Sequence, residues 1–175
     1  MKYILPVVFF TLITCTYKTP EEKSIESVIG KEINLEMYRT ILYYGDTIPF
    51  GIFRNKYEYL SLVYLQNNCM PCYEKYILWN RRMDTLSSNK HTVLFIIIGR
   101  SVNDFLNEVK LKEDIEMKYF IKMDPNFNFL RGNQEIPKWI IEQSLLIDEE
   151  NKIKLVGQPF LNPELSKQFM NIISN

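Results

Sequence analysis

Residues 59–79 read YLSLVYLQNNCMPCYEKYILW, and this stretch decides the fold. It opens with a short run of large apolar and β-favouring residues that is too compact for a helix and typical of a buried strand. The residues after it predict an amphipathic helix, because apolar side chains recur there at helical spacing. They are Cys72, Tyr76, Trp79, Met83 and Leu86. A Cys-x-x-Cys motif, formed by Cys69 and Cys72, thus lies at a strand-to-helix junction.

Neighbouring segments extend the alternation of strand and helix. The run TVLFIII at 92–98 predicts a central strand of a parallel sheet, because such strands are covered on both faces and read as unbroken apolar runs. Ser101 has the sequence context of a helix N-cap, and KYFIKMD at 118–124 predicts the next strand. Upstream, weaker patterns favour a helix at 24–31 and short strands or extended chain within 33–53.

The end of the chain predicts a hairpin and a helix. SLLID at 144–148 and KIKLVG at 152–157 are separated by three residues, a spacing suited to two antiparallel strands. Asn162 is the expected N-cap of a terminal helix, and Pro163 is its expected first residue. The order that follows from these patterns is strand, helix, strand, helix, strand, hairpin and helix.

The length, composition and charge of the chain set limits on the number of domains and on the kinds of partner. A chain of 175 residues with 46% hydrophobic and 14% aromatic residues can bury the core of one domain without metals or several disulfides. Twenty-one basic residues balance twenty-one acidic ones, and no block of Lys and Arg stands out. The electrostatic surface of a nucleic-acid-binding protein is therefore not expected. We predict one globular domain and no nucleic-acid partner.

The N-terminus predicts export. A twelve-residue apolar run, YILPVVFFTLIT at 3–14, is too short to span a bilayer and suits the central region of a signal peptide. It ends at LITC, which resembles the lipobox of bacterial lipoproteins, and this resemblance implies that Cys15 is lipidated and becomes the first residue after cleavage. The alternative is an ordinary secretory signal in which Cys15 is incidental. With Cys15 assigned to lipid, the three cysteines leave one pair, Cys69 and Cys72.

The position of this cysteine pair predicts a reactive dithiol. The unpaired amides and partial positive charge of a helix N-terminus favour a thiolate over a thiol, and Cys69 is placed to benefit. We expect Cys69 to be the more exposed, attacking sulfur, and Cys72, one turn further on the apolar face, to resolve the mixed disulfide. Three residues along a helix separate Cα atoms by about 5 Å, a distance that a disulfide tolerates. The pair can therefore open and close with little backbone movement.

Four segments carry a family resemblance: 59–79, VLFIII at 93–98, FIKMDPNFNFL at 120–130 and SLLIDEENKIKLVGQP at 144–159. Together they resemble the thioredoxin-like thiol-disulfide oxidoreductases of bacterial envelopes, in particular a group of thioredoxin-like lipoproteins of Gram-negative anaerobes. The resemblance covers roughly residues 31–173. It implies an α/β fold, a thioredoxin-like three-layer sandwich in which a central mixed sheet is flanked by helices.

The resemblance also implies a function. Cys69 would attack and Cys72 would resolve, without a cofactor, and the partners would be thiols or disulfides of envelope proteins. The chain would divide into a signal peptide at 1–14, a lipidated tether at 15–32 and a thioredoxin-like domain at 33–175. The lipid would anchor the protein to a membrane of the bacterial envelope, facing the periplasm or on the outer membrane.

Three positions depart from the family pattern. Asn68 stands where thioredoxins usually have a tryptophan, and Val63 stands where they bury an acidic proton acceptor. Their cis-proline, which shapes the groove where the partner's sulfur docks, has its matching place near Glu142 or Gln143, and the nearest proline is Pro137. These departures bear on partner recognition and on rate, and they leave the dithiol chemistry in place.

Metal chemistry has weaker support in the sequence. His91 is the only histidine, and we expect it to be a solvent-facing residue at a strand entrance without a functional role. Structural zinc sites use four ligands, and two mature cysteines plus one distant histidine fall short. Cu(I) could use Cys69, Cys72 and Met70 as soft ligands, yet the copper-delivery proteins of this fold have a longer cysteine spacing and a dedicated histidine. We therefore expect no metal.

A non-enzymatic function is the main alternative. In that hypothesis the domain is a binding module on the membrane, and Cys69 and Cys72 form a permanent structural disulfide of the kind that exported proteins keep. A four-residue loop removes little entropy from the unfolded chain, so such a bridge contributes comparatively little stability. This small contribution favours the redox function over the structural one.

Overall fold

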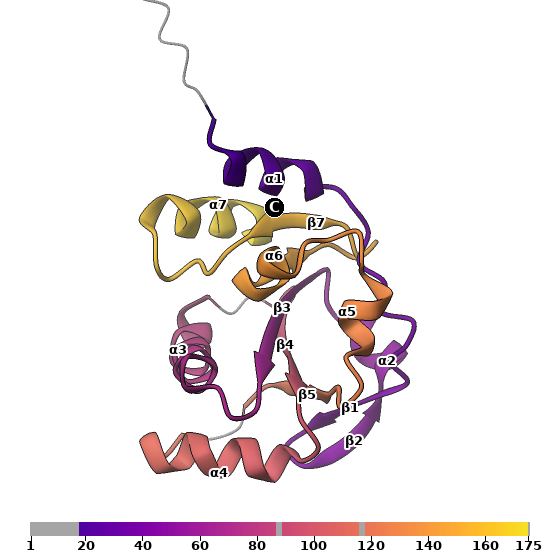
Figure 1. Cartoon of the computed structure of the whole chain (residues 1–175), viewed down its shortest axis with the longest axis vertical. Helices are drawn as coiled ribbons and strands as arrows, with labels where there is room; N and C mark the ends of the chain where they lie inside the picture. Colours follow the sequence, from indigo (N-terminus) through magenta and orange to yellow (C-terminus); the bar gives the residue numbers. More distant parts are fainter. Residues whose placement is uncertain (1–17, 87–88, 116–117, 175) are drawn as a thin grey trace, which may run out of the picture.

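The computed structural model describes residues 18–86, 89–115 and 118–174, and its strands join in one sheet (Figure 1). The strands are β1 (Thr40–Tyr43), β2 (Asp46–Pro49), β3 (Tyr59–Gln66), β4 (His91–Ile98), β5 (Phe120–Met123), β6 (Leu145–Ile147) and β7 (Ile153–Val156). Their order across the sheet is β2-β1-β5-β4-β3-β6-β7. The central strands β3, β4 and β5 are parallel, whereas β6 runs antiparallel to β3 and β1 antiparallel to β5. The sheet is therefore mixed, as predicted.

Helices cover both faces of this sheet (Figure 1). They are α1 (Pro20–Val28), α2 (Phe50–Arg54), α3 (Met70–Leu86), α4 (Val102–Lys112), α5 (Asn128–Gly132), α6 (Lys138–Gln143) and α7 (Pro163–Ser174). The apolar side chains of α3, α4 and α7 pack on one face, and those of α1, α2, α5 and α6 pack on the other. The predicted three-layer α/β architecture is confirmed.

The alternation of side chains along β3 places the start of α3. Val63 and Leu65 face the cluster beneath α3 and α4, whereas Leu62 and Tyr64 face the cluster beneath α5 and α6. Both faces are buried, because a central strand of a parallel sheet has helices on each side. The end of β3 is thereby fixed between two apolar layers, and the chain leaves it directly toward the cysteines.

Most of the predicted elements are confirmed at close to their predicted bounds. β3 and β4 begin at the predicted strand or one residue before it, and β6 and β7 form the predicted hairpin. The Oγ of Ser101 accepts a hydrogen bond from the main-chain N–H of Asp104 at 3.3 Å, which confirms the predicted cap of α4. The Oδ1 of Asn162 accepts one from the main-chain N–H of Glu164 at 2.8 Å at the start of α7.

Two short helices that the sequence did not predict lie between β5 and β6. The carboxylate of Asp124 is buried and accepts hydrogen bonds from the main-chain N–H groups of Asn128 and Phe129, at 2.8 and 2.9 Å, where α5 begins. Pro137 then precedes the first residue of α6. The last two residues of α6, Glu142 and Gln143, line a cavity together with the cysteine pair.

The described part of the predicted tether, residues 18–32, contains helix α1. Thr19 and Glu22 form a reciprocal capping box at its start, and Val28 near its end is fully buried. The chain then pairs with the hairpin, since the main-chain N–H of Gly30 donates to the carbonyl of Ile153 at 2.8 Å. The predicted signal peptide and Cys15 lie outside the described residues. None of the helices that the structure describes has the length and apolarity needed to cross a membrane.

The prediction that His91 faces solvent is wrong. Its side chain is 3% exposed, because His91 is the first residue of β4 and its ring packs against Phe169 of α7, which covers this end of the strand. The Nε2 of His91 lies 2.9 Å from the Oγ of Ser61 on β3. Burial lowers the pKa of His91 to about 3, so the imidazole is neutral in the folded protein.

Candidate active site

The two cysteines of the Cys-x-x-Cys motif are joined in a disulfide, with their Cα atoms 5.2 Å apart. Cys69 immediately precedes α3, and its carbonyl accepts hydrogen bonds from the main-chain N–H groups of Cys72 and Tyr73 at 3.0 and 3.3 Å. Pro71 lies in this first turn, where a main-chain N–H has no partner within a helix. The predicted strand-to-helix position of the pair is confirmed.

Both cysteines are half-buried, and they differ in their surroundings. Cys72 packs against the apolar cluster beneath α3, as its place on the apolar face predicts. Met70, between the two cysteines, is 57% exposed. The disulfide therefore lies at the edge of the core, with one sulfur-bearing residue against apolar side chains and the intervening turn open to solvent.

A tyrosine hydroxyl holds the residue before Cys69. Asn68 has a left-handed backbone conformation, with φ of 57°, and its main-chain N–H donates to the hydroxyl of Tyr73 at 2.8 Å. Asparagine is one of the few residues besides glycine that adopts this conformation readily. This local geometry is a physical reason for Asn68 to stand at a position where thioredoxins usually have a tryptophan.

A glycine makes room for the other residue of this turn. The main-chain N–H of Asn67 donates to the carbonyl of Ile98 at 2.9 Å, and its side chain lies over Gly99. A Cβ atom at Gly99 would lie 2.9 Å from Nδ2 of Asn67, closer than such atoms approach. The turn between β3 and α3 is thus packed against the end of β4.

A cavity of about 340 Å³ opens beside the disulfide. One wall comes from the start of α3 and the other from the end of α6, which is the place predicted to match the cis-proline of the family. Val63, which stands where thioredoxins bury an acidic residue, is fully buried among apolar side chains. The cavity is lined by Tyr64, Leu65, Gln66, Cys69, Pro71, Cys72, Lys75, Glu142, Gln143 and Gln158.

A half-buried lysine spans the two walls of this cavity. The Nζ of Lys75, one helical turn beyond Cys72, donates a hydrogen bond to the main-chain carbonyl of Glu142 at 2.7 Å. Burial lowers the pKa of Lys75 to about 8, and the nearby Glu142 side chain opposes that shift in part. An ordinary lysine titrates at about 10.4, so this amine exchanges protons much closer to neutral pH.

Lys75 and the hydroxyl of Tyr73 are site features that our sequence reasoning missed. Lys75 does not belong to the apolar face that the helical spacing from Cys72 to Leu86 predicts. The signal that was available is its spacing, because residues three apart on a helix lie on the same side, and Lys75 is three residues after Cys72. Nothing local in the sequence indicated that α6 would close over it.

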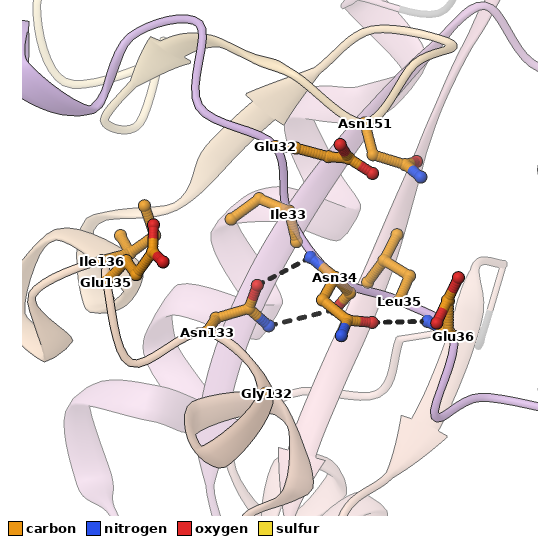
Figure 2. A pocket seen from close by; sticks show the side chains of 10 residues that line it. All are labelled: Glu32, Ile33, Asn34, Leu35, Glu36, Gly132, Asn133, Glu135, Ile136 and Asn151. Atoms are coloured by element: carbon orange, nitrogen blue, oxygen red, sulfur yellow. Dashed lines mark hydrogen bonds between the residues drawn. The ribbon is translucent and has the colours of Figure 1, made fainter.

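A second cavity, of about 400 Å³, has different lining residues, mainly asparagine and glutamate side chains (Figure 2). Asn133 bridges two of its segments, since its Oδ1 accepts from the main-chain N–H of Asn34 at 2.7 Å and its Nδ2 donates to the Asn34 carbonyl at 3.0 Å (Figure 2). These bonds attach the segment after α1 to α5. In the part of the chain that the structure describes, no three His, Cys, Asp or Glu side chains are grouped as a metal site requires.

Similar solved structures exist, although no family model and no curated protein matches the chain. A putative thiol:disulfide interchange protein DsbE from Chlorobium tepidum has a TM-score of 0.54 and 14% identity, over 77% of this chain and 92% of that one. A putative protein disulfide isomerase from Bacteroides thetaiotaomicron has a TM-score of 0.56 and 17% identity, over 84% and 91% of the two chains. A pneumococcal exposed lipoprotein thioredoxin from Streptococcus pneumoniae has a TM-score of 0.53 and 16% identity, over 76% and 97%. These likenesses confirm the predicted fold: the chain has a thioredoxin-like fold, with a disulfide at the start of α3.

Proposed function

We propose that this protein is a thiol-disulfide oxidoreductase that works through Cys69 and Cys72. The observation that carries the proposal is the half-buried disulfide at the N-terminus of α3, beside a cavity large enough to admit part of a partner protein. The names of the similar structures support it, since several are thiol-disulfide exchange proteins. A purely structural bridge has no need of such a cavity.

The exchange proceeds in two displacements when the protein acts as a reductant. The Cys69 thiolate attacks a disulfide of the partner, forms a mixed disulfide and releases one partner thiolate. Cys72, as a thiolate, then attacks the Cys69 sulfur, re-forms the internal disulfide and releases the second partner thiolate. The partner gains two electrons, and the cysteine pair loses them. The same steps in reverse oxidise a partner dithiol.

The proposal includes a location. A signal peptide at 1–14 would be removed, Cys15 would carry the lipid, and residues 15–32 would connect it to the thioredoxin-like domain at 33–175. Support comes from the apolar run that ends at LITC and from the similar pneumococcal protein, which is named an exposed lipoprotein thioredoxin. The protein would then face the periplasm or lie on the outer membrane, with envelope proteins as partners. Mass spectrometry of the mature N-terminus tests this, and an unmodified terminus at another residue contradicts it.

Trapping of mixed disulfides tests the proposed activity. The Cys72→Ser variant, incubated with an oxidised envelope extract of a Gram-negative bacterium, should form covalent complexes that disappear on reduction, because Cys69 attacks and nothing resolves the product. The matched control is Cys69→Ser, which should trap far fewer proteins. If both variants trap none, the Cys69–Cys72 bridge is structural and the protein is better described as a binding module.

A further inference from the structure

The cavity beside the disulfide is lined by a lysine that has no part in the two displacements described above. The Lys75 amine reaches from α3 to the carbonyl of Glu142 and lines the same cavity as Cys69 and Cys72. Its stem lies one helical turn beyond Cys72, on the same side of α3. The second displacement requires Cys72 to lose a proton, and Val63 leaves the family's usual place for a proton acceptor apolar.

We infer that the Lys75 amine takes up the proton of Cys72 during the second displacement and returns it when exchange runs in reverse, an inference that rests on the proposed function. As the neutral amine accepts the proton, the Cys72 thiol becomes the thiolate that attacks the Cys69 sulfur. The amine becomes an ammonium, and the partner thiolate leaves. In reverse, a partner thiolate attacks Cys69, Cys72 leaves as a thiolate, and the ammonium gives it a proton.

The proton affinity of Lys75 suits this task. A general base works best when its pKa lies near the working pH and near the pKa of the group that it deprotonates. Burial lowers the pKa of Lys75 to about 8, close to the ordinary thiol value of about 8.5. At pH 7 an amine with a pKa of about 8 is neutral in roughly one molecule in ten, whereas an ordinary lysine amine is neutral in fewer than about one in a thousand.

The other titratable groups that line the cavity are less suited. Burial raises the pKa of Tyr64 on β3, so its hydroxyl holds its proton at neutral pH. The carboxylate of Glu142 on α6 is paired with Lys138, with 3.3 Å between Nζ and Oε1. Gln66, Gln143 and Gln158 do not titrate. Besides the cysteines, Lys75 is the lining group with a proton affinity near that of a thiol.

The two displacements can be timed separately with dithiobis(nitrobenzoate) as the disulfide. Reduced protein releases one coloured thionitrobenzoate when Cys69 attacks and a second when Cys72 resolves, and stopped-flow absorbance follows both. Two variants are compared with wild type across pH 6 to 10. Lys75→Met removes the amine, whereas Lys75→Arg keeps a charge and a hydrogen-bond donor that stay protonated. The matched control is Lys138→Met, which removes a cation near Glu142 that does not line the cavity.

The inference predicts a specific change in the second release. In wild type and Lys138→Met its rate should level off near pH 8, where Lys75 loses its proton. At pH 7 both Lys75 variants should give a second release about tenfold slower than that of wild type, which is the factor that one pKa unit gives. The rate of the second release in these variants should keep rising beyond pH 9. The first release should stay within about twofold. If the Lys75→Met variant does not fold, the comparison of Lys75→Arg with wild type tests the inference.

The outcomes separate this inference from the proposed function. A wild-type pH profile for the second release in Lys75→Met overturns the inference and leaves the function intact. A wild-type profile in Lys75→Arg also overturns it, since the lysine would then supply only charge or a hydrogen bond. A first release no faster than that of glutathione in the wild-type protein contradicts the proposed function itself, and the inference falls with it.

Discussion

The main-chain N–H of Asn68 donates a hydrogen bond to the hydroxyl of Tyr73, 2.8 Å away, across the N-terminus of α3. Tyr73 is buried, and its ring packs against Phe105 of α4 with ring centres 5.0 Å apart. The residues on either side of the Cys-x-x-Cys turn are therefore tied together independently of the disulfide. This arrangement allows the cysteine pair to open while the turn keeps its shape.

Removal of that hydroxyl should weaken the turn. Tyr73→Phe leaves the Asn68 N–H without its acceptor, and we expect the free energy of unfolding to fall by about 1 kcal/mol in urea titrations. The matched control is Tyr38→Phe on the opposite face, because the buried Tyr38 hydroxyl has no hydrogen-bond partner among the described residues. Its removal should therefore leave the free energy of unfolding unchanged. Equal losses in the two variants would show that the Asn68 contact contributes nothing.

Protonation of His91 in the unfolded state should make the free energy of unfolding depend on pH, even above the range in which carboxylates titrate. Its pKa is about 3 in the folded protein and about 6.5 when unfolded, so the unfolded state binds more protons between these values. Stability should therefore fall as the pH drops below 6.5, by about 2 kcal/mol at pH 5. Urea titrations at pH 7, 6 and 5 measure this, and His91→Gln should flatten the trend. An equally steep trend in that variant would contradict the assignment to His91.

The disulfide should contribute little to stability. Chain-entropy arguments give about 2 kcal/mol for so short a loop. We expect the Cys69→Ser, Cys72→Ser double variant to stay folded by circular dichroism and to lose no more than this amount. The reduced wild-type protein should also stay folded and should lose no more stability than the double variant. Unfolding on reduction alone would mean that the bridge is a structural staple.

The Glu142 carboxylate should raise the pKa of the Lys75 amine. Its side chain raises the pKa of Lys75 against the larger effect of burial. Glu142→Gln removes that charge and keeps the main-chain carbonyl to which Lys75 donates, so the Lys75 titration midpoint should move below 8. Carbon NMR of the Lys75 Cε against pH reads the midpoint. An unchanged or higher midpoint would show that the carboxylate does not act on this amine.

The sequence predicted the framework of the fold well, because its signals there are local. The unbroken apolar runs that became β3 and β4 need both faces covered, and the helical spacing from Cys72 to Met83 fixes one face of α3. The hairpin and the cap at Asn162 follow from short patterns as well. The position of Cys69 and Cys72 at the junction could therefore be read from the sequence alone.

The missed features depend on contacts between distant segments. Helices α5 and α6 are each six residues or shorter and lack a clear period, so the cavity wall at Glu142 had no sequence signal. His91 became buried because α7, far along the chain, covers the start of β4. The lowered pKa of Lys75 depends on that same α6 wall, and spacing alone indicates no burial.

The pH dependence of alkylation of the reduced protein tests the central claim most directly, namely that Cys69 is an activated nucleophile and Cys72 its resolving partner. Iodoacetamide rates at each cysteine are followed by mass spectrometry from pH 5 to 10. We predict that Cys69 reacts first, with a midpoint below the ordinary thiol value of about 8.5, and that Cys72 reacts much more slowly. Equal and slow alkylation of both cysteines, with midpoints at or above that value, would contradict the account.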